Sequence, residues 1–348
     1  MERIIGINGF GRIGRAILRK ALESKDFDNF VINDINPDNK NIAYQLKYDS
    51  LYGRLNKEIS SDETGIIVDG KKIFIYHKED IDTVPWDKHG VAKVVEASGV
   101  HNNTVRARNL KNKVEQIVIT HSPAEERLVD RYVVMGINEG TIDIKNDLII
   151  SNSVCDANAF GPVINVLNRE YGVDHGFLTT LHPWLSYQNL LDGPTPSFAY
   201  PGHIDSHYIF GRASTFSLMP KPTTTVDATS KILKFLKGKF YSFSYRVPTA
   251  TVSSSDISVK LNKKAGKEDV IKLFKEEENK QKLKIFYNNF DPLVSIDFKG
   301  MEYSAIIDHR WTAINDGNYL KLILWYDNEW GYSCRVVDLI NYLFSRDK

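Results

Sequence analysis

A cysteine at the expected start of a helix, followed by a histidine further along the chain, is the pair of residues best suited to chemistry in this sequence. Cys155 stands in Ser-Asn-Ser-Val-Cys-Asp-Ala-Asn, and His182 stands in Leu-His-Pro-Trp. A helix N-terminus and a nearby imidazole both lower the pKa of a thiol and favour the nucleophilic thiolate. We therefore predict that Cys155 is a nucleophile and His182 its base, with a structural buried cysteine as the alternative. Cys334 has no such partner nearby in sequence and is expected to be structural.

A glycine fingerprint near the N-terminus indicates what this nucleophile works with. The run Gly9-Phe-Gly11-Arg-Ile-Gly14 lies between an expected strand and an expected helix. In such a βαβ unit the first glycine permits the turn, the second admits a pyrophosphate, and the third lets the helix pack on the strand. Asp34 ends the next strand, where a carboxylate binds ribose hydroxyls and repels a 2′-phosphate, so NAD is favoured over NADP. A glycine-rich turn without a ligand is the alternative.

Length and charge limit the classes of function. A chain of 348 residues suits two domains with a cleft between them. With 45 basic and 44 acidic residues the net charge is +1, which gives no electrostatic case for nucleic acid or an anionic membrane as partner. We expect a cytoplasmic protein, because two cysteines indicate a reducing compartment and we see neither a signal peptide nor a membrane span.

The order of expected elements predicts an α/β fold. A Rossmann dinucleotide-binding domain is expected over residues 1–154, where strand and helix patterns alternate and residues 65–76 read as a hairpin. An α+β catalytic domain with a mainly antiparallel sheet is expected over 155–329, beginning with a helix at 157–170. The C-terminal helix, within 330–348, is expected to pack back on the first domain.

The chain resembles the glyceraldehyde-3-phosphate dehydrogenase family along nearly its whole length. The matching segments are Ile7-Asn-Gly-Phe-Gly-Arg-Ile-Gly-Arg, Asn33-Asp34, Lys47-Tyr-Asp-Ser, Ala97-Ser-Gly-Val, Val134-Met-Gly-Ile-Asn, Ser151-Asn with Cys155, Thr179-Thr-Leu-His182, Asp192-Gly-Pro, Gly211-Arg-Ala-Ser, Tyr245-Arg-Val-Pro-Thr and Trp325-Tyr-Asp-Asn-Glu-Trp-Gly-Tyr. The resemblance implies a thiolate that attacks an aldehyde to give a thiohemiacetal, hydride transfer to NAD, and release of the thioester to a second nucleophile, usually inorganic phosphate. It also implies a homotetramer.

The resemblance assigns further residues to the site. It places Arg12, Ile13 and Ser98 at the cofactor. Asn328 matches the residue that holds the nicotinamide carboxamide, with Tyr332 packing nearby. The residues expected around the anionic groups of the substrate are Arg212, Arg246, Thr223 and Asp156.

Departures from the family pattern gather where the family binds phosphate. Val154 and Asp156 flank the nucleophile, and Asp156 replaces a hydroxyl donor. Two unit charges about 4 Å apart repel by roughly 4 kcal/mol at an effective dielectric of about 20, so an inward carboxylate weakens phosphate binding and raises the pKa of Cys155. Alternatively, Asp156 points away and only complements the helix dipole. After the histidine, Leu185 and Tyr187 replace the two threonines that hold the substrate phosphate, and Thr224 replaces a glycine after Thr223.

The segment 195–210 is longer than the corresponding family loop, which lines the cofactor site of a neighbouring subunit. It carries Tyr200, His203 and His207 among other aromatic and histidine residues. We expect no metal site there, because Pro201-Gly202 disfavours a helix that would align the two histidines and no third ligand is near.

Three functions stay open at this stage. The first is NAD-dependent oxidation of an aldehyde, such as glyceraldehyde 3-phosphate, with phosphate as acyl acceptor. The second is a non-phosphorylating enzyme, similar to erythrose-4-phosphate dehydrogenases or acting on another aldehyde, which passes the acyl group to water or another acceptor. The third is an NAD-binding scaffold or sensor without turnover.

Overall fold

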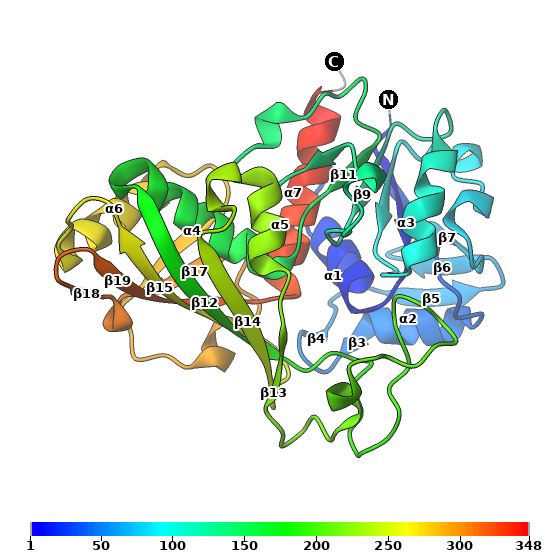
Figure 1. The fold of residues 1–348 in the computed structure, drawn as a ribbon. Coiled ribbons are helices and arrows are strands. Elements are labelled where there is room, and N and C mark those ends of the chain that lie inside the picture. Colours follow the sequence, from blue (N-terminus) through cyan, green and yellow to red (C-terminus); the bar gives the residue numbers. More distant parts are fainter. Residues whose placement is uncertain (1, 347–348) are drawn as a thin grey trace.

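Two β-sheets, one mostly parallel and one mostly antiparallel, organise the chain (Figure 1). The structure is a computed structural model that describes residues 2–346. Residues 1, 347 and 348, which fall in the predicted ranges 1–154 and 330–348, lie outside the described residues.

The first sheet is the predicted Rossmann sheet, built around a buried central strand. Its strands are β1 (Ile4–Asn8), β2 (Asn29–Asn33), β5 (Ile59–Asp62), β6 (Gly65–Val68), β7 (Lys71–Tyr76), β8 (Lys93–Glu96), β9 (Gln116–Ile119), β10 (Arg131–Tyr132) and β11 (Ile149–Ser151). Within residues 2–346 their order is β10-β11-β9-β8-β1-β2-β7-β6-β5, parallel from β10 to β7. The central strands β8 and β9 are buried at every position because both faces of a parallel sheet are covered. A separate short pair consists of β3 (Tyr48–Asp49) and β4 (Gly53–Arg54).

The predicted hairpin at 65–76 is confirmed as the antiparallel pair β6–β7, which lies next to the edge strand β5 and not at the edge itself. Its two turn residues, Asp69 and Gly70, have φ angles of 48° and 79°. Positive φ at both central residues is what a two-residue hairpin turn requires to match the strand twist.

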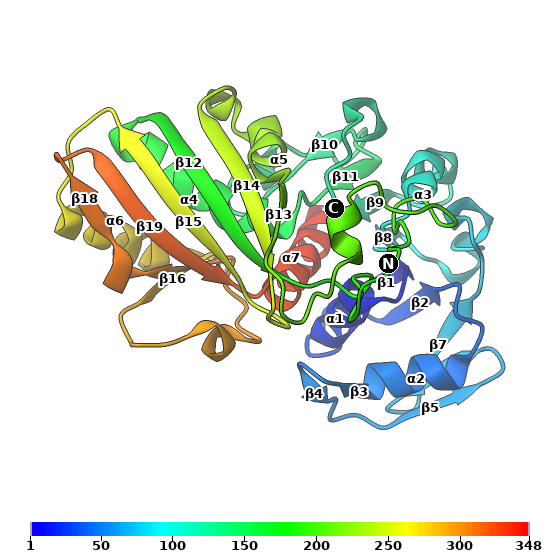
Figure 2. The ribbon, with the colours of Figure 1, turned by 60° about the horizontal axis from the view of Figure 1, so that its bottom comes forward.

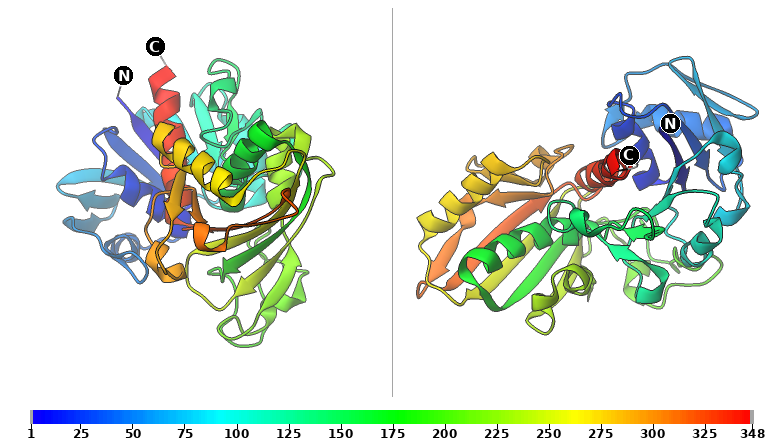
Figure 3. Two further views of the ribbon diagram at one scale, coloured as in Figure 1. Left: turned by 90° about the vertical axis from the view of Figure 1, so that its left-hand side faces the viewer. Right: turned by 90° about the horizontal axis from the view of Figure 1, so that it is seen from above.

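Helices cover the first sheet, and the C-terminal helix is one of them. The helices are α1 (Arg12–Ala21), α2 (Asn39–Lys47), α3 (His101–Arg106) and α7 (Trp330–Arg346). Ile17 of α1 shares a buried core with Ile7 of β1 and with Val336 and Ile340 of α7. Figure 3 shows α7 in red, between the two sheets. The domain boundaries at residues 154 and 329 stay predictions.

The second sheet is mainly antiparallel, as predicted, and three helices pack on one of its faces (Figure 2). Its strands are β12 (Val173–Pro183), β13 (Met219–Pro222), β14 (Phe240–Val247), β15 (Ser253–Leu261), β16 (Phe286–Asn289), β17 (Ala305–Asp308), β18 (Ala313–Asn315) and β19 (Tyr319–Tyr326). The helices are α4 (Cys155–Tyr171), α5 (Thr225–Ile232) and α6 (Lys267–Lys280). Among the described strands of this second sheet, only the pairs β12–β14 and β16–β17 are parallel.

In the part of the chain from residue 2 to residue 346, no helix combines the length and the apolar character needed to span a bilayer.

Candidate active site

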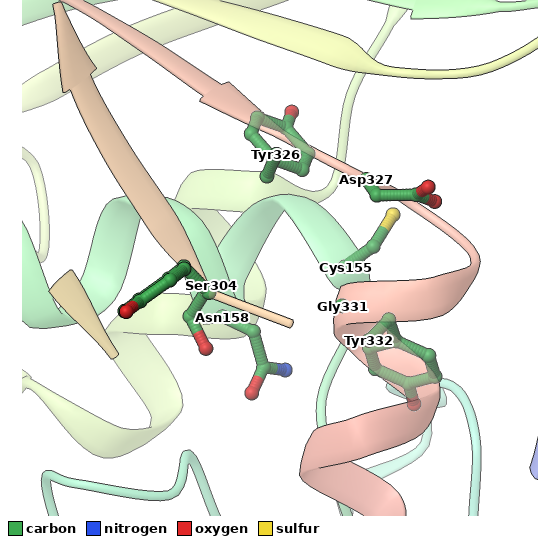
Figure 4. A pocket seen from close by; sticks show the side chains of 8 residues that line it. Cys155, Asn158, Ser304, Tyr326, Asp327, Gly331 and Tyr332 are labelled. Carbon is green, nitrogen blue, oxygen red and sulfur yellow. The ribbon is translucent and has the colours of Figure 1, made fainter. Parts of the chain in front are cut away.

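Cys155 lies where the chain passes from the first sheet into the first helix of the second core. Strand β11 ends at Ser151, and α4 begins at Cys155 after a short turn. In that turn Ser153 has a φ of 56°, which non-glycine residues rarely adopt. The Tyr332 hydroxyl donates to the Ser153 carbonyl at 3.3 Å. This turn places the thiol at the first position of α4, next to β19 and α7 (Figure 4).

His182 comes from the neighbouring strand β12 and presents one ring nitrogen to the thiol. Its Nδ1 lies 2.8 Å from the Pro183 carbonyl oxygen, which can only accept, so Nδ1 carries the proton. Its Nε2 is therefore an acceptor in the neutral ring and lies 3.8 Å from the Cys155 Sγ. The two residues predicted to do chemistry are thus side by side, with the histidine in the tautomer of a base.

The Asp156 carboxylate points into the site and not away from it. Its Oδ1 accepts a hydrogen bond from the Tyr326 hydroxyl at 2.8 Å and one from the Cys155 thiol at 3.4 Å. Its Oδ2 accepts from the Thr225 hydroxyl at 3.1 Å. Asp156 is only 7% exposed, and the thiol, one carboxylate oxygen and one ring nitrogen of His182 lie within 4.8 Å of one another. The alternative in which Asp156 only complements the helix dipole is therefore wrong.

Cys155, Asp156 and His182 form a trio whose protonation states are set by burial and by the Asp156 charge. Burial raises the pKa of the Cys155 thiol well above its usual range, and the Asp156 charge raises it further. Burial lowers the pKa of His182 to about 4, and Arg246 adds to the fall. Burial also opposes ionisation of Asp156, but His182 and the Tyr326 hydroxyl outweigh it and hold the Asp156 pKa below its usual range. At neutral pH the site holds a thiol, a neutral imidazole and a carboxylate, so the expected lowering of the thiol pKa by His182 is not found.

Two cations border this trio. Arg246 on β14 pairs in register with His182 on β12, is 8% exposed, and has no partner for its Nε among the described residues. Lys221 on β13 is half-buried, and burial together with the charge of Arg246 lowers its pKa to about 8. The negative charge of Asp156 opposes that fall, because it favours the charged form of Lys221.

A cavity of about 420 Å³ opens over the thiol and the imidazole. Several of the residues that depart from the family pattern line it, among them Val154, Leu185 and Tyr187. A second crevice also borders the thiol and is lined by residues of α4, β19 and α7 (Figure 4). It leaves no space for a water molecule, so the reacting partner enters through the larger cavity.

The glycine fingerprint borders a cavity of about 450 Å³ together with Asp34 and Ser98. Gly9 has a φ of 90°, and a Cβ there would lie 2.4 Å from the Ser98 backbone. A Cβ at Gly14 would lie 2.1 Å from the Gly9 carbonyl oxygen, whereas Gly11 faces open space. The turn therefore brings the N-terminus of α1 to the cavity, which suits the pyrophosphate of a dinucleotide.

Three other predicted cofactor residues also line these cavities. Asp34 accepts hydrogen bonds from the backbone N–H groups of Phe10 at 2.6 Å and Asn36 at 2.9 Å. Asn328 lines the cavity over the thiol, is 6% exposed, and has no partner for its Oδ1 among residues 2–346. An unpartnered buried acceptor there fits the amide of a nicotinamide, and Tyr332 lines the same cavity.

Arg12 and Ile13 also line the cavity over the thiol, at the start of α1. The Arg12 guanidinium pairs with Asp49 and Glu329. Because that side chain is engaged by two carboxylates, Arg12 offers a cofactor mainly its backbone at the helix N-terminus.

The long loop 195–210 contacts the cofactor region of its own chain. Phe198 lines both cavities, and a Cβ at Gly99 would lie 2.6 Å from its ring. The His101 N–H donates to the Ala199 carbonyl at 3.0 Å, and the rings of His101 and Tyr200 lie 5.4 Å apart. The contact of this loop with a neighbouring subunit stays a prediction.

None of the four predicted substrate residues lines either cavity. Asp156 and Arg246 are buried beside the thiol and the imidazole, whereas Arg212 and Thr223 lie further from them. Arg212 has a side chain that is 69% exposed and donates to Asp192 at 2.8 Å. Thr223 reaches the site only indirectly, because its hydroxyl lies 2.7 Å from that of Thr225, which binds Asp156.

Three residues of the site escaped the sequence analysis. Tyr326 stands inside a matched segment, directly before Asp327-Asn328, and that position was a signal that its hydroxyl lies near the cofactor. Thr225 belongs to the run Thr223-Thr-Thr, of which only the first two members were considered. Lys221 lies between two prolines with no motif around it, so no signal in the sequence pointed to it.

Comparison with known proteins adds two findings. Residues 3–104 match the family described as "Glyceraldehyde 3-phosphate dehydrogenase, NAD binding domain", and residues 154–328 match "Glyceraldehyde 3-phosphate dehydrogenase, C-terminal domain". The chain is 38% identical to glyceraldehyde-3-phosphate dehydrogenase 1 of Bacillus cereus over 343 residues, which are 98% of both chains. It is 36% identical to the glyceraldehyde-3-phosphate dehydrogenases of Claviceps purpurea (99% of this chain, 98% of the relative) and Geobacillus stearothermophilus (98% of both).

Proposed function

Because this chain belongs to the glyceraldehyde-3-phosphate dehydrogenase family of NAD-dependent dehydrogenases, we propose that it oxidises an aldehyde through a thioester on Cys155. The aldehyde is a phosphorylated one, such as glyceraldehyde 3-phosphate. The observation that carries this proposal is the His182 Nε2, unprotonated and 3.8 Å from the Cys155 Sγ, in the same cavity as the unpartnered Asn328.

The proposed mechanism begins with the neutral thiol. The Cys155 sulfur bonds to the aldehyde carbon while its proton passes through His182 to the aldehyde oxygen, which gives a thiohemiacetal. His182 Nε2 then takes the hydroxyl proton, and this removal drives the C–H hydride out. NAD, when bound, supplies the hydride acceptor. Asn328 is the residue that would hold the carboxamide, and Gly9, Gly11, Gly14, Asp34 and Ser98 are those that would hold the rest of the dinucleotide.

Arg246 and Lys221 support an anionic substrate. Both place positive charge beside the thiol, and Arg246 has a free Nε donor. A guanidinium fork and an ammonium group are the common ligands of phosphate. The threonines that hold the phosphate in the family are absent, so these two cations carry more of its binding here.

A second candidate is the non-phosphorylating reaction, in which water or another neutral acceptor releases the acyl group. The inward Asp156 carboxylate favours it, because inorganic phosphate would approach the thioester against this charge. The scaffold alternative has no such support, since a scaffold has no use for a histidine in the tautomer of a base.

The test is NADH formation with phosphorylated and unphosphorylated aldehydes, each with and without inorganic phosphate. We expect turnover of a sugar phosphate that is lost in Cys155→Ser. Turnover without phosphate selects the second candidate, and a strict phosphate requirement eliminates it. No turnover of any sugar phosphate contradicts the substrate assignment.

The proposal includes the setting of the reaction. The Rossmann part over residues 1–154 with the helix 330–348 binds NAD, and residues 155–329 bind the aldehyde. We propose a cytoplasmic homotetramer, which size-exclusion chromatography with light scattering tests.

A further inference from the structure

The Asp156 carboxylate is held by hydroxyl groups from two elements that are distant from it in sequence. Tyr326 comes from β19 and Thr225 from α5, and both donate to it. A carboxylate that served only the dipole of α4 would need neither donor and would not be 7% exposed. The protein therefore fixes a negative charge at hydrogen-bond distance from its nucleophile.

Formation of the thioester changes the partners of this carboxylate. An ionised carboxylate has about four lone-pair sites, of which the thiol and two hydroxyls use three. Once the Cys155 sulfur is acylated, it has no proton to donate, and the place on Oδ1 that accepted it is vacated. The Asp156 Oδ1 itself lies 3.4 Å from the sulfur, and the acyl carbon is bonded directly to that sulfur. A water molecule donating to Oδ1 would have its oxygen next to that carbon.

We propose that Asp156 is the general base that activates water for hydrolysis of the Cys155 thioester. This inference rests on the proposed function, of which it specifies the acceptor and the residue that delivers it. As the water oxygen bonds to the carbonyl carbon, Asp156 takes one water proton. The C–S bond then breaks, the sulfur recovers the proton from Asp156, and a carboxylic acid leaves. The step needs water only and consumes no oxidant or reductant.

The charge of Asp156 also favours water over inorganic phosphate as the acceptor of the acyl group. It repels inorganic phosphate and attracts the proton of a neutral water. The low pKa of Asp156 keeps it in the basic form at neutral pH. General base catalysis of this kind contributes roughly 10² to 10⁴ in rate.

The test acylates Cys155 without an aldehyde and without NAD. p-Nitrophenyl acetate releases one nitrophenolate as it acetylates the thiol, and further release then reports hydrolysis of the thioester. In Asp156→Asn we expect a burst at least as fast as in the wild type, followed by a steady rate about 100-fold lower. The acetyl group should remain on Cys155 in mass spectra. Hydroxylamine, a nucleophile that needs no base, should release it from the variant.

Two outcomes overturn the proposal. The first is a steady rate in Asp156→Asn within about threefold of the wild-type rate, which is far below the effect of losing a general base. The second is loss of the burst itself in a folded variant. Asp156→Ser repeats the measurement with a smaller neutral residue if the asparagine variant does not fold. The experiment is independent of the aldehyde assay. If the wild type hydrolyses the acetyl thioester in a way that depends on Asp156 but forms no NADH from any aldehyde, this inference stands and the proposed function is rejected. If NADH forms but hydrolysis does not depend on Asp156, the proposed function stands and this inference is rejected.

Discussion

The Asp156 Oδ1 lies 3.4 Å from the Cys155 Sγ, closer than the His182 Nε2, which lies at 3.8 Å. The thiol of the resting protein therefore donates its hydrogen bond to a carboxylate and not to the imidazole. A carboxylate in this place stabilises the thiol and opposes the thiolate. Activation of the nucleophile is thus tied to the arrival of the aldehyde, when the proton can leave through His182.

Replacing Asp156 by asparagine should make Cys155 more reactive toward iodoacetamide. Loss of the negative charge lowers the thiol pKa, and a fall of about one unit gives a roughly tenfold faster alkylation at neutral pH. Mass spectrometry of the labelled protein measures the rate. Cys334 is an internal control, because it is 1% exposed and burial raises its pKa to about 12. An unchanged rate at Cys155 would contradict the electrostatic account.

Lys221→Gln should weaken binding of a phosphorylated aldehyde and abolish the rise of KM at alkaline pH. Burial lowers the pKa of Lys221 to about 8, so its charge is present below that pH and is lost as the pH rises through it. In the wild type, KM should increase when the pH exceeds about 8. In the variant, KM at neutral pH should be about tenfold higher than in the wild type, as expected for the loss of one charge-assisted contact, and it should not increase further at alkaline pH. Steady-state kinetics across this pH range measure both. An unphosphorylated aldehyde is the control and should show neither effect.

The local part of the site was predictable from sequence because it depends on short patterns. The turn at Gly9, Gly11 and Gly14 and the strand before it follow from spacing alone, as does the hairpin at 65–76. Pairing of Cys155 with His182 needed the family resemblance as well. The parallel and antiparallel sheets follow from buried runs in one half of the chain and alternating runs in the other.

The contacts of Asp156 were not predictable, because they join distant parts of the chain. Tyr326 is 170 positions from it and Thr225 is 69 positions away, and only the packing of β19 and α5 on α4 brings them together. The place of Arg212 was not predictable for the opposite reason, because a carboxylate closer in sequence, Asp192, forms an ion pair with it at the surface. No sequence motif indicates whether an arginine will pair with a neighbouring carboxylate or with an anionic ligand.

The same substitution at the two arginines should separate their roles. Arg246→Gln removes a buried charge next to the trio, so kcat/KM for a phosphorylated aldehyde should fall by about 100-fold, the scale of a charged hydrogen bond of about 3 kcal/mol. Because Arg246 lowers the pKa of His182, the acid limit of activity should also move to higher pH. Arg212→Gln breaks only an exposed pair and should stay within about twofold. Equal losses in both variants would contradict the placement of Arg212 at the surface and of Arg246 beside the nucleophile.

His309→Gln should reduce the loss of stability in acid. His309 is buried between Asn288 and Thr312, and burial lowers its pKa to about 4. The unfolded chain binds this proton near pH 6.5, so the stabilisation is present above that pH and is lost as the pH falls to about 4. The shift corresponds to about 3 kcal/mol per histidine, and His121 and His182 act in the same sense. Urea unfolding at a series of pH values should show a shallower acid slope in the variant, and an identical slope would refute the assignment.

Glu96→Gln should change the pH dependence in the opposite direction. Glu96 is fully buried at the end of β8, where it accepts hydrogen bonds from Asn8 and Ser98. Burial raises its pKa to about 7, above the unfolded value near 4.5, so its stabilisation is present below pH 4.5 and is lost as the pH rises through 7. The glutamine variant has no proton to lose. Its free energy of unfolding relative to the wild type should therefore rise by about 3 kcal/mol between acid and mildly alkaline pH. A constant difference across this range would show that Glu96 keeps an ordinary pKa and that the Asn8 and Ser98 donors, and not burial, control its charge beside the cofactor cavity.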